Sequence, residues 1–483
     1  MNQHIFRAYD IRGHADRDLP DPFVRRLGRA VAARLRRCDP ADHADHGPRS
    51  DERPDSPLIA LGRDCRLSSP RLAAALSQGL REAGAHVLEL GVVPTPQVYF
   101  AAHRGLCDGA VQVTGSHNPP ADNGFKILHG TAALHTDDIA ALARDIERAG
   151  ASEPDPTAES RGRLSQRDVG PDYLDYAVAS LRLGPRRCRI VVDAGNGTGG
   201  PTALALYRRL GFDVVGLYCD MDGRFPNHHP DPLDPDNLSE LRRRVQAEGA
   251  ELGLAFDGDA DRVAAVDERG RILWGDQLLI LFGRALLAEH PGATVVTEVK
   301  CSSAVESELT RLGGHVYMGQ AGHSLVKAAM RARGALLAGE LSGHIFFADR
   351  WPGFDDGIYA GARLLELVSR GDERFAAHCD TLPVMVNTPE LRVASSDSHK
   401  RAVVAHVTQA LRAHPEVVSV LDVDGIRANV DGGWGLVRAS NTQADIVLRC
   451  EAVDQTRLAA IRRLLEKHVA QAQRAVGDPA LSD

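Results

Sequence analysis

The stretch CRIVVDAGNGTGGPTALALYRRLGF, residues 188–212, runs from a short apolar segment through a glycine-rich turn into an amphipathic helical pattern. The same order recurs in PLIALGRDCRLSSPRLAAALSQGLREAG, residues 57–84, and in TVVTEVKCSSAVESELTRLGG, residues 294–314. Apolar runs of strand length that alternate with helical patterns are typical of α/β units. Because the copies lie about 100–130 residues apart, we expect three related α/β domains rather than a short-period solenoid.

The end of the chain has a different pattern. Residues 417–424, 426–430 and 444–451 alternate apolar and polar side chains like half-buried strands, and a helical pattern follows over residues 454–471. This mixture predicts a smaller, separate α+β domain.

The composition argues against several classes of protein. The chain has 483 residues, of which 43% are hydrophobic and 25% charged, the ordinary mixture for a globular protein of several domains. A net charge of −8 argues against a nucleic-acid partner. The sequence has no secretory apolar region and no apolar run near the ~20 residues that a membrane crossing needs. Its eight cysteines are scattered without a CxxC pair, so we expect reduced thiols and a cytoplasmic protein.

A serine stands on a predicted turn in GAVQVTGSHNPPADNGFKI, residues 109–127. The segment begins as a strand and is then broken by Gly115 and by Pro119 and Pro120, which places Ser116 just beyond a strand end. Ligands gather at the carboxyl ends of strands in open α/β sheets. Ser116 is therefore a candidate nucleophile or phosphate carrier. The alternative is a turn that uses serine and asparagine for local hydrogen bonds.

Three carboxylates cluster in GLAFDGDADRVAAVDERGRIL, residues 253–273. Asp257, Asp259 and Asp261 stand between two strand-like runs, and each like-charge pair at ~4 Å would repel by about 4 kcal/mol at an effective dielectric near 20. A hard divalent cation would remove this repulsion. A calcium EF-hand is excluded because Arg262 stands where that loop needs glycine and the flanks are strand-like. Three carboxylates plus a water or phosphate oxygen favour Mg²⁺; a solvated acidic turn is the alternative.

These two segments resemble the α-D-phosphohexomutase superfamily, and within it the bacterial phosphomannomutase/phosphoglucomutase branch. The motifs that carry the resemblance are FRAYDIRG, TGSHNPP with NGFKI, DGDADR and GELSGH, and the likeness covers nearly the whole chain apart from residues 39–56. It implies three α/β domains of one topology with mixed sheets and a smaller C-terminal α+β domain, arranged around a central cleft. One departure is Ala260, where many members of the superfamily have glycine.

The resemblance also implies roles for individual residues. Ser116 would carry a phosphate, whose oxygen completes a Mg²⁺ shell with Asp257, Asp259 and Asp261. Three further residues would contact the transferring group: His117, Lys126 and Arg262. The sugar and its other phosphate would be bound by Tyr9, Arg12, Lys300, His323, Glu340, Ser342, His344, Arg438, Ser440, Asn441 and Thr442. Which residue acts as general base is left open.

The implied activity is reversible phosphoryl transfer between O6 and O1 of mannose or glucose phosphates. It would proceed through the phosphoserine, with Mg²⁺ and hexose 1,6-bisphosphate as cofactors. We expect a small phosphosugar as the partner, no nucleic acid, no membrane, and a monomer or dimer. Three alternatives are a phosphoglucosamine mutase, a non-catalytic phosphosugar-binding protein and a magnesium-dependent phosphatase with an aspartyl nucleophile. The apolar Leu341 between Glu340 and Ser342 argues against an amino sugar.

The expected domain boundaries follow the motifs. Domain I covers residues 1–168 with a disordered insertion at 39–56. Domain II covers 169–275 and holds the metal-binding segment. Domain III covers 276–385 and holds the sugar-recognition segment. Domain IV covers 386–483 and holds the phosphate-binding segment.

Overall fold

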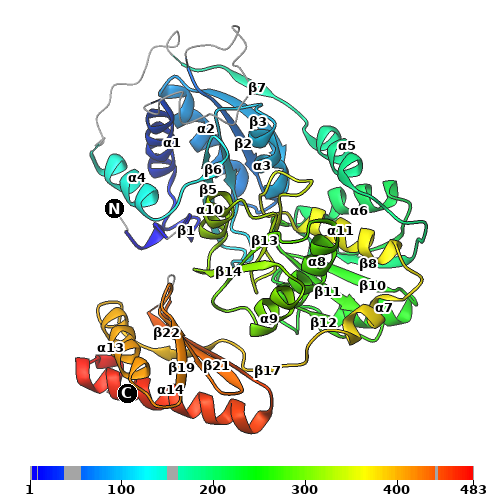
Figure 1. The fold of residues 1–483 in the computed structure, drawn as a ribbon. Helices are drawn as coiled ribbons and strands as arrows, with labels where there is room; N and C mark the ends of the chain where they lie inside the picture. The colour runs from blue at the N-terminus through cyan, green and yellow to red at the C-terminus, as the bar shows by residue number, and fades with distance from the viewer. Residues whose placement is uncertain (1–2, 8, 37–55, 149–160, 441–443, 482–483) are drawn as a thin grey trace. The chain divides into compact units, whose positions relative to one another are not determined.

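The chain forms two compact units in a computed structural model (Figure 1). The structure describes residues 3–7, 9–36, 56–148, 161–440 and 444–481, so the predicted disorder of residues 39–56 lies almost wholly outside the described residues. Unit 1 comprises Met1–Leu278 and Ser342–Asp380, and unit 2 comprises Leu279–Leu341 and Thr381–Asp483. No described helix combines the length and apolar character that crossing a membrane requires.

The first sheet of unit 1 is mixed and has the order β1-β5-β4-β2-β3-β7, with β6 paired to β5. The strands are β1 (Ile11–His14), β2 (Leu58–Arg63), β3 (His86–Val92), β4 (Gly109–Val113), β5 (Asp122–His129), β6 (Ala132–Ala133) and β7 (Leu164–Gln166). The helices are α1 (Asp21–Arg36), α2 (Ser69–Glu82), α3 (Thr95–His103) and α4 (Asp137–Arg148), and a 3-10 turn, η1 (Gln3–Ile5), precedes them. Apolar residues at helical spacing on α1 and α2 pack with Ile59 and Leu61 of β2, while α3 lies against the other face (Figure 1).

The second sheet of unit 1 has the order β12-β11-β10-β8-β9. Its strands are β8 (Arg189–Asp193), β9 (Asp213–Leu217), β10 (Leu252–Phe256), β11 (Val263–Asp267) and β12 (Ile272–Leu273). The nearby helices are α5 (Gly170–Ser180), α6 (Gly199–Arg209) and α7 (Ser239–Ala247). The chain passes into unit 2 within α8 (Gly275–Glu289), and returns for β16 (Ile345–Phe347), α11 (Gly357–Ser369) and α12 (Phe375–Asp380).

Unit 2 contains a parallel set of strands and an antiparallel sheet. The parallel set has the order β14-β13-β15, built from β13 (Thr294–Glu298), β14 (His315–Gly319) and β15 (Leu337–Gly339), with α9 (Ser303–Arg311) and α10 (His323–Arg333). The antiparallel sheet has the order β17-β22-β21-β20-β19, with β18 paired to β22. Its strands are β17 (Val386–Asn387), β18 (Leu391–Ala394), β19 (Val417–Leu421), β20 (Ile426–Val430), β21 (Gly433–Ala439) and β22 (Asp445–Ala452). Helices α13 (Lys400–Arg412) and α14 (Gln455–Val476) pack on this sheet, and a 3-10 turn, η4 (Pro479–Leu481), ends it.

The three strand–turn–helix copies predicted from the sequence are confirmed. They form β2-α2, β8-α6 and β13-α9, and each leads into a strand that pairs in parallel with the first: β3, β9 and β14. A third parallel strand then joins the other edge of the first strand: β4, β10 or β15. The segments of Ser116, of the three aspartates and of Glu340 each follow that third strand. The predicted functional segments therefore occupy one equivalent place in three copies of one topology.

Two strands of the structure have no counterpart in the sequence pattern. One is β7, which pairs in parallel with β3 through Leu164, Ser165 and Gln166 in a polar stretch. The C-terminal prediction missed β21, in which Gly433 and Gly435 interrupt the apolar alternation. A side chain at Gly435 would meet Leu465 of α14 at 2.7 Å, so the sheet and helix need glycine there.

A buried arginine ties the antiparallel sheet to the rest of unit 2. Arg427 on β20 donates hydrogen bonds to the carbonyl oxygens of Val299 (2.8 Å) and Cys301 (2.7 Å). Its guanidinium carbon lies 3.7 Å from the Trp434 ring centroid. Burial lowers the pKa of Arg427 to about 10. The hydrogen bonds tie β20 to the residues directly after β13, and the cation–π contact with Trp434 of β21 helps to fix the guanidinium.

Helix α11 of unit 1 begins at a buried carboxyl group. Asp356 accepts a hydrogen bond from the Tyr359 backbone N–H (2.8 Å) and another from the Tyr173 hydroxyl (2.8 Å). Burial, with the nearby charge of Asp355, raises the pKa of Asp356 to about 8. The group is protonated in the folded chain at pH values where it would be ionised in the unfolded chain. Stability from this site is therefore present at low pH and falls as the pH rises from about 4 to 8.

We expect Asp356→Asn to remove this pH dependence. The amide oxygen keeps the helix-capping acceptor but cannot ionise. The unfolding free energy of the variant should rise relative to the parent chain between pH 5 and pH 8, by at most about 1.4 kcal/mol per pH unit. Urea unfolding of both chains at the two pH values measures the difference. An equal difference at both pH values would contradict the assignment.

Candidate active site

The predicted turn of Ser116 and the predicted acidic turn meet inside unit 1. The serine loop, residues 114–121, joins β4 to β5, and the acidic loop, residues 257–262, joins β10 to β11. The Ser116 hydroxyl donates a hydrogen bond of 2.7 Å to Asp257 Oδ2. At Gly258 an added Cβ would lie 2.5 Å from the Ser116 carbonyl oxygen, so glycine permits this close approach.

Ser116 is held in a constrained conformation. Its φ is +48°, its side chain is buried, and its N–H donates to Thr114 Oγ1 at 2.8 Å. A non-glycine residue at positive φ costs free energy, so surrounding contacts must fix it there. His117 Nδ1 lies 3.1 Å from Ser116 Oγ. Burial and the charges of Arg262 and Arg12 hold the pKa of His117 well below its ordinary value, so this ring is neutral.

A residue that sequence reasoning missed, Arg66, holds the serine loop. Its side chain is fully buried and donates to four backbone carbonyls of the loop and its end: Ser116 (2.7 Å), Asn118 (2.6 Å), Pro119 (2.5 Å) and Asp122 (3.0 Å). The planar guanidinium suits such a fork of acceptors. The sequence signal that could have identified Arg66 is GRDCRLSS, residues 62–69. It is a polar turn that directly follows the apolar run of the strand–turn–helix copy at residues 57–84.

Asp64 completes this clamp. Its carboxylate accepts from Arg66 Nε (3.1 Å), from the Thr114 hydroxyl (2.8 Å) and from the Gly115 N–H (3.2 Å). A Cβ at Gly115 would lie 2.5 Å from Arg66 Cζ, so the clamp requires glycine at this position. The buried ion pair therefore joins the turn after β2 to the turn after β4.

The acidic loop buries all three of its aspartates. Asp257, Asp259 and Asp261 are each 0% exposed, and one carboxylate oxygen from each lies within 4.8 Å of the others. Ala260, which stands between two of them, has a φ of +60°, where glycine is favoured. The departure noted in the sequence is thus a strained alanine rather than a change of ligand.

Lys126 of β5 lies against this cluster. Its ammonium contacts Asp259 Oδ2 at 2.6 Å and also pairs with Asp261. Burial opposes the charge of Lys126, but Asp259 and Asp261 outweigh it and raise the pKa of the lysine. Burial likewise opposes ionisation of Asp259, and the lysine holds its pKa below the usual range. Burial and the two neighbouring carboxylates raise the pKa of Asp257.

The donor set of the acidic loop fits a hard divalent cation. Asp259 Oδ1 and Asp261 Oδ1 are buried and make no hydrogen bond with the described residues. One ammonium cannot balance three carboxylates, and all the candidate ligands are oxygens, which Mg²⁺ prefers. The flanking β10 and β11 are strands, which confirms that the loop is not an EF-hand. Asp257, Asp259, Asp261 and the Ser116 oxygen are the groups that could hold the ion.

Three more predicted residues of unit 1 are Arg12, Arg262 and Tyr9. Arg12 of β1 donates to the Asn118 side chain at 2.8 Å. Arg262 donates from Nε to His344 Nε2 at 2.9 Å, and its backbone N–H donates to Asp257 at 3.2 Å. Tyr9 directly precedes Asp10, whose carboxylate pairs with Arg12. The buried Ser342 begins the second segment of unit 1, and its predicted sugar contact stays a prediction.

The remaining predicted residues belong to unit 2, and two of them, Lys300 and Arg438, lie close to carboxylates there. Lys300 Nζ lies 3.4 Å from Glu390, and Arg438 pairs with Asp424 at 3.0 Å. Burial opposes the charge of Lys300, but Glu298 and Glu390 outweigh it and raise its pKa, with a smaller effect from Glu340.

The other predicted residues of unit 2 are placed as follows. His323 begins α10, with Nδ1 3.3 Å from Lys327 Nζ, and Glu340 and Ser440 are buried. Asn441 and Thr442 lie outside the described residues.

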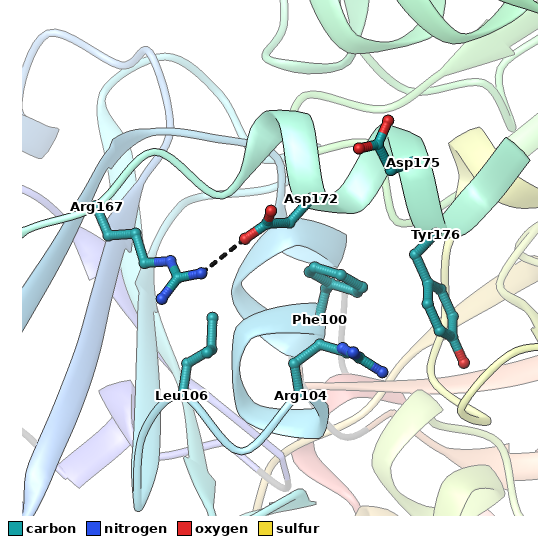
Figure 2. Close-up of a pocket in the computed structure, with 7 residues that line it drawn as sticks. All are labelled: Phe100, Arg104, Leu106, Arg167, Asp172, Asp175 and Tyr176. Carbon is teal, nitrogen blue, oxygen red and sulfur yellow. Dashed lines mark hydrogen bonds and ion pairs between the residues drawn. The ribbon is translucent and has the colours of Figure 1, made fainter. Parts of the chain in front are cut away.

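A surface hollow of 360 Å³ elsewhere in unit 1 is separate from this site (Figure 2). It lies between α3 and α5 and is lined by Phe100, Arg104, Leu106, Arg167, Asp172, Asp175 and Tyr176. Arg167 pairs with Asp172 at 2.7 Å, and the Arg104 guanidinium lies 5.0 Å from the Tyr176 ring centroid. The hollow contains no predicted site residue, and its charges largely neutralise one another.

Comparison with known proteins gives matches along nearly the whole chain. Models for phosphoglucomutase/phosphomannomutase match as alpha/beta/alpha domain I (residues 3–152), domain II (171–270), domain III (274–384) and the C-terminal domain (390–468).

Individual relatives agree with these models. The phosphoglucomutase of Neisseria gonorrhoeae is 41% identical over 96% of this chain and 95% of its own. The phosphomannomutase/phosphoglucomutase of Pseudomonas aeruginosa is 40% identical over the same shares. A crystal structure of a family protein from Burkholderia thailandensis is 40% identical, covers 98% of both chains and has a TM-score of 0.87.

We expect Arg66→Lys to loosen the serine loop. A lysine keeps the charge beside Asp64 but cannot reach four carbonyls, so the unfolding free energy should fall by about 2–4 kcal/mol. Amide hydrogen exchange over residues 114–122 should become at least about tenfold faster. Arg71→Lys is the matched control, because the Arg71 guanidinium is partly exposed and its ion pairs are with the exposed carboxylates of Asp16 and Asp21. Unchanged protection of the loop in Arg66→Lys would contradict the clamp.

Proposed function

This chain belongs to the phosphoglucomutase/phosphomannomutase family, and we propose that it transfers a phosphoryl group reversibly between O6 and O1 of a hexose phosphate. Ser116 is the carrier. The observation that supports this most strongly is the Ser116 hydroxyl, buried and within 2.7 Å of a carboxylate of the acidic cluster.

In the proposed reaction the Oγ–P bond of phosphorylated Ser116 breaks while a sugar hydroxyl forms the new O–P bond. The proton of that hydroxyl passes, in net terms, to the Ser116 Oγ, which becomes a hydroxyl group. The product is a hexose 1,6-bisphosphate. After it turns over, its other phosphate returns to Ser116 and leaves the isomeric monophosphate. Transfer of this kind is catalysed mainly by positioning and by compensating charge.

The protein's own groups supply both effects. Arg66 and Asp64 fix the serine loop, and Gly258 lets the acidic loop reach it. Phosphorylated Ser116 has no hydroxyl proton to share with Asp257, and it adds a charge of about −1.5 to −2 beside that carboxylate. Added positive charge then becomes necessary, and Lys126 and Arg262 provide part of it.

We propose Mg²⁺ as the cation that provides the rest. Asp257, Asp259, Asp261 and a phosphate oxygen on Ser116 would hold it, in keeping with the buried carboxylate oxygens that lack hydrogen bonds. When bound, such an ion neutralises negative charge on the transferring group. If the bisphosphate intermediate leaves the site before the second transfer, Ser116 is left without its phosphate. Hexose 1,6-bisphosphate is therefore the proposed activator, because it can phosphorylate Ser116 again.

The residues of unit 2 are proposed to bind the sugar and the phosphate that is not transferring. Glu340 offers a buried carboxylate for hydroxyl groups, whereas Lys300, Arg438 and Ser440 offer donors for a phosphate. The four domain boundaries, the cytoplasmic location and the monomeric or dimeric state predicted from the sequence stay predictions.

Glucose and mannose phosphates are the proposed substrates, in line with the names of the relatives. A phosphoglucosamine mutase stays the nearest alternative, and Leu341 argues against it because it offers no polar group to an amino sugar. A phosphatase with an aspartyl nucleophile would release inorganic phosphate, and it would have no need for the contacts by which Arg66 and Asp64 hold the serine loop. A non-catalytic binding protein would have no turnover at all.

The test is to compare turnover of glucose 1-phosphate, mannose 1-phosphate and glucosamine 1-phosphate with bisphosphate and Mg²⁺ present. The first two should isomerise to 6-phosphates at least about tenfold faster than the third, without release of inorganic phosphate. Ser116→Ala should lose about a thousandfold or more. Ser77→Ala, at another buried serine on α2, is the matched control. Retention of turnover within tenfold in Ser116→Ala would overturn the proposal.

A further inference from the structure

Thr95, the first residue of α3, makes two hydrogen bonds to the acidic loop. Its backbone N–H donates to the Asp259 carbonyl oxygen at 2.9 Å, and its hydroxyl donates to Asp259 Oδ2 at 2.5 Å. Both residues are 0% exposed and belong to unit 1. The start of α3 is therefore bound both to the backbone and to the carboxylate of one aspartate.

The Thr95 hydroxyl is not used by its own helix. A threonine at the start of a helix often accepts a hydrogen bond from one of the first backbone N–H groups and so caps the helix. Helix α3 has no side-chain cap, and the residue before it is Pro94. Because the hydroxyl has no capping contact, its hydrogen bond to Asp259 is the interaction for which this position uses threonine.

The two oxygens of the Asp259 carboxylate have different surroundings. Oδ2 accepts from the Thr95 hydroxyl and from Lys126 Nζ, which lies 2.6 Å away. Oδ1 is buried and makes no hydrogen bond with the described residues. Two donors on one oxygen fix the rotation of the carboxylate, so Oδ1 is the oxygen left for a cation.

The two donors differ in how they respond to a cation. The Lys126 ammonium also pairs with Asp261, and a divalent ion held by the acidic loop would repel this positive charge. The Thr95 hydroxyl is neutral, so no such repulsion opposes its hydrogen bond to Oδ2. Thr95 is therefore the group that can hold the carboxylate in the same orientation when an ion is bound.

The orientation of a carboxylate affects which ion a site prefers. Ca²⁺ takes 6–8 oxygen ligands in a flexible shell and often binds both oxygens of one carboxylate, whereas Mg²⁺ needs a nearly ideal octahedron. We propose that Thr95 is a positioning residue that keeps Asp259 as a one-oxygen ligand and thereby favours Mg²⁺ over Ca²⁺. This inference rests on the cation site of the proposed function, but not on the phosphoryl transfer.

The experiment measures ion binding without any assay of activity. The chain is freed of metal with a chelator, and electron paramagnetic resonance gives its Kd for Mn²⁺, against which Mg²⁺ and Ca²⁺ then compete. Thr95→Val removes the hydroxyl at almost constant shape and should weaken Mg²⁺ at least about tenfold but Ca²⁺ less than about threefold. Thr95→Ser keeps the hydroxyl and should bind both ions within about threefold of the parent chain. If Thr95→Val does not fold, Thr95→Ala gives the same comparison.

Thr388→Val is the matched control. Thr388 is a buried threonine of unit 2 whose hydroxyl accepts from the Cys450 N–H at 3.0 Å, so its loss affects the fold without touching the acidic loop. Unchanged Mg²⁺ binding in Thr95→Val, or equal weakening of Mg²⁺ and Ca²⁺, would overturn the proposal. A parent chain that binds none of the three ions would overturn it together with the proposed cation. If the ions bind as expected but no sugar phosphate is isomerised, the proposed reaction fails and the role of Thr95 stands.

Discussion

Three carboxylates are buried within a few ångströms of one another, and neighbouring groups of unit 1 offset their mutual repulsion. Lys126 reaches in from β5 and pairs with two of them, and the Ser116 hydroxyl donates to the third. Desolvation makes uncompensated charge of this kind costly, so the cluster persists only with positive charge close by. The same requirement makes the loop a good site for a hard cation and for a phosphoryl group whose charge the cation offsets.

Rigid backbone brings the two loops to this cluster. Ser116 and Ala260 both adopt positive φ, and both stand in turns that follow the third parallel strand of their copy. Arg66 donates to four carbonyls of the serine loop and its end, which holds Ser116 in its strained conformation. One repeated topology thus supplies three equivalent turns with different functional groups. The turn after β4 holds the Ser116 hydroxyl, the turn after β10 holds the three aspartates, and the turn after β15 holds Glu340.

The sequence predicted the three α/β copies and the C-terminal α+β domain, because strand–turn–helix order leaves local patterns. The meeting of Ser116 with the aspartates was predicted only from the resemblance to the superfamily. It missed β21, where glycines needed for packing hide the alternation. It also missed Arg66 and Asp64, which are separated from the serine loop that they hold by stretches of chain that only folding brings together. Lys126 was assigned only through the resemblance carried by NGFKI, since its neighbours in the chain are ordinary strand residues.

The cation is the element on which this account depends most. The direct measurement is an anomalous difference map from crystals of the phosphorylated protein grown with Mn²⁺ in place of Mg²⁺. The account predicts one strong peak bound by Asp257, Asp259, Asp261 and an oxygen on Ser116, at about 2.0–2.3 Å from each ligand. A map without a peak at the acidic loop, with Lys126 still bridging Asp259 and Asp261, would contradict it.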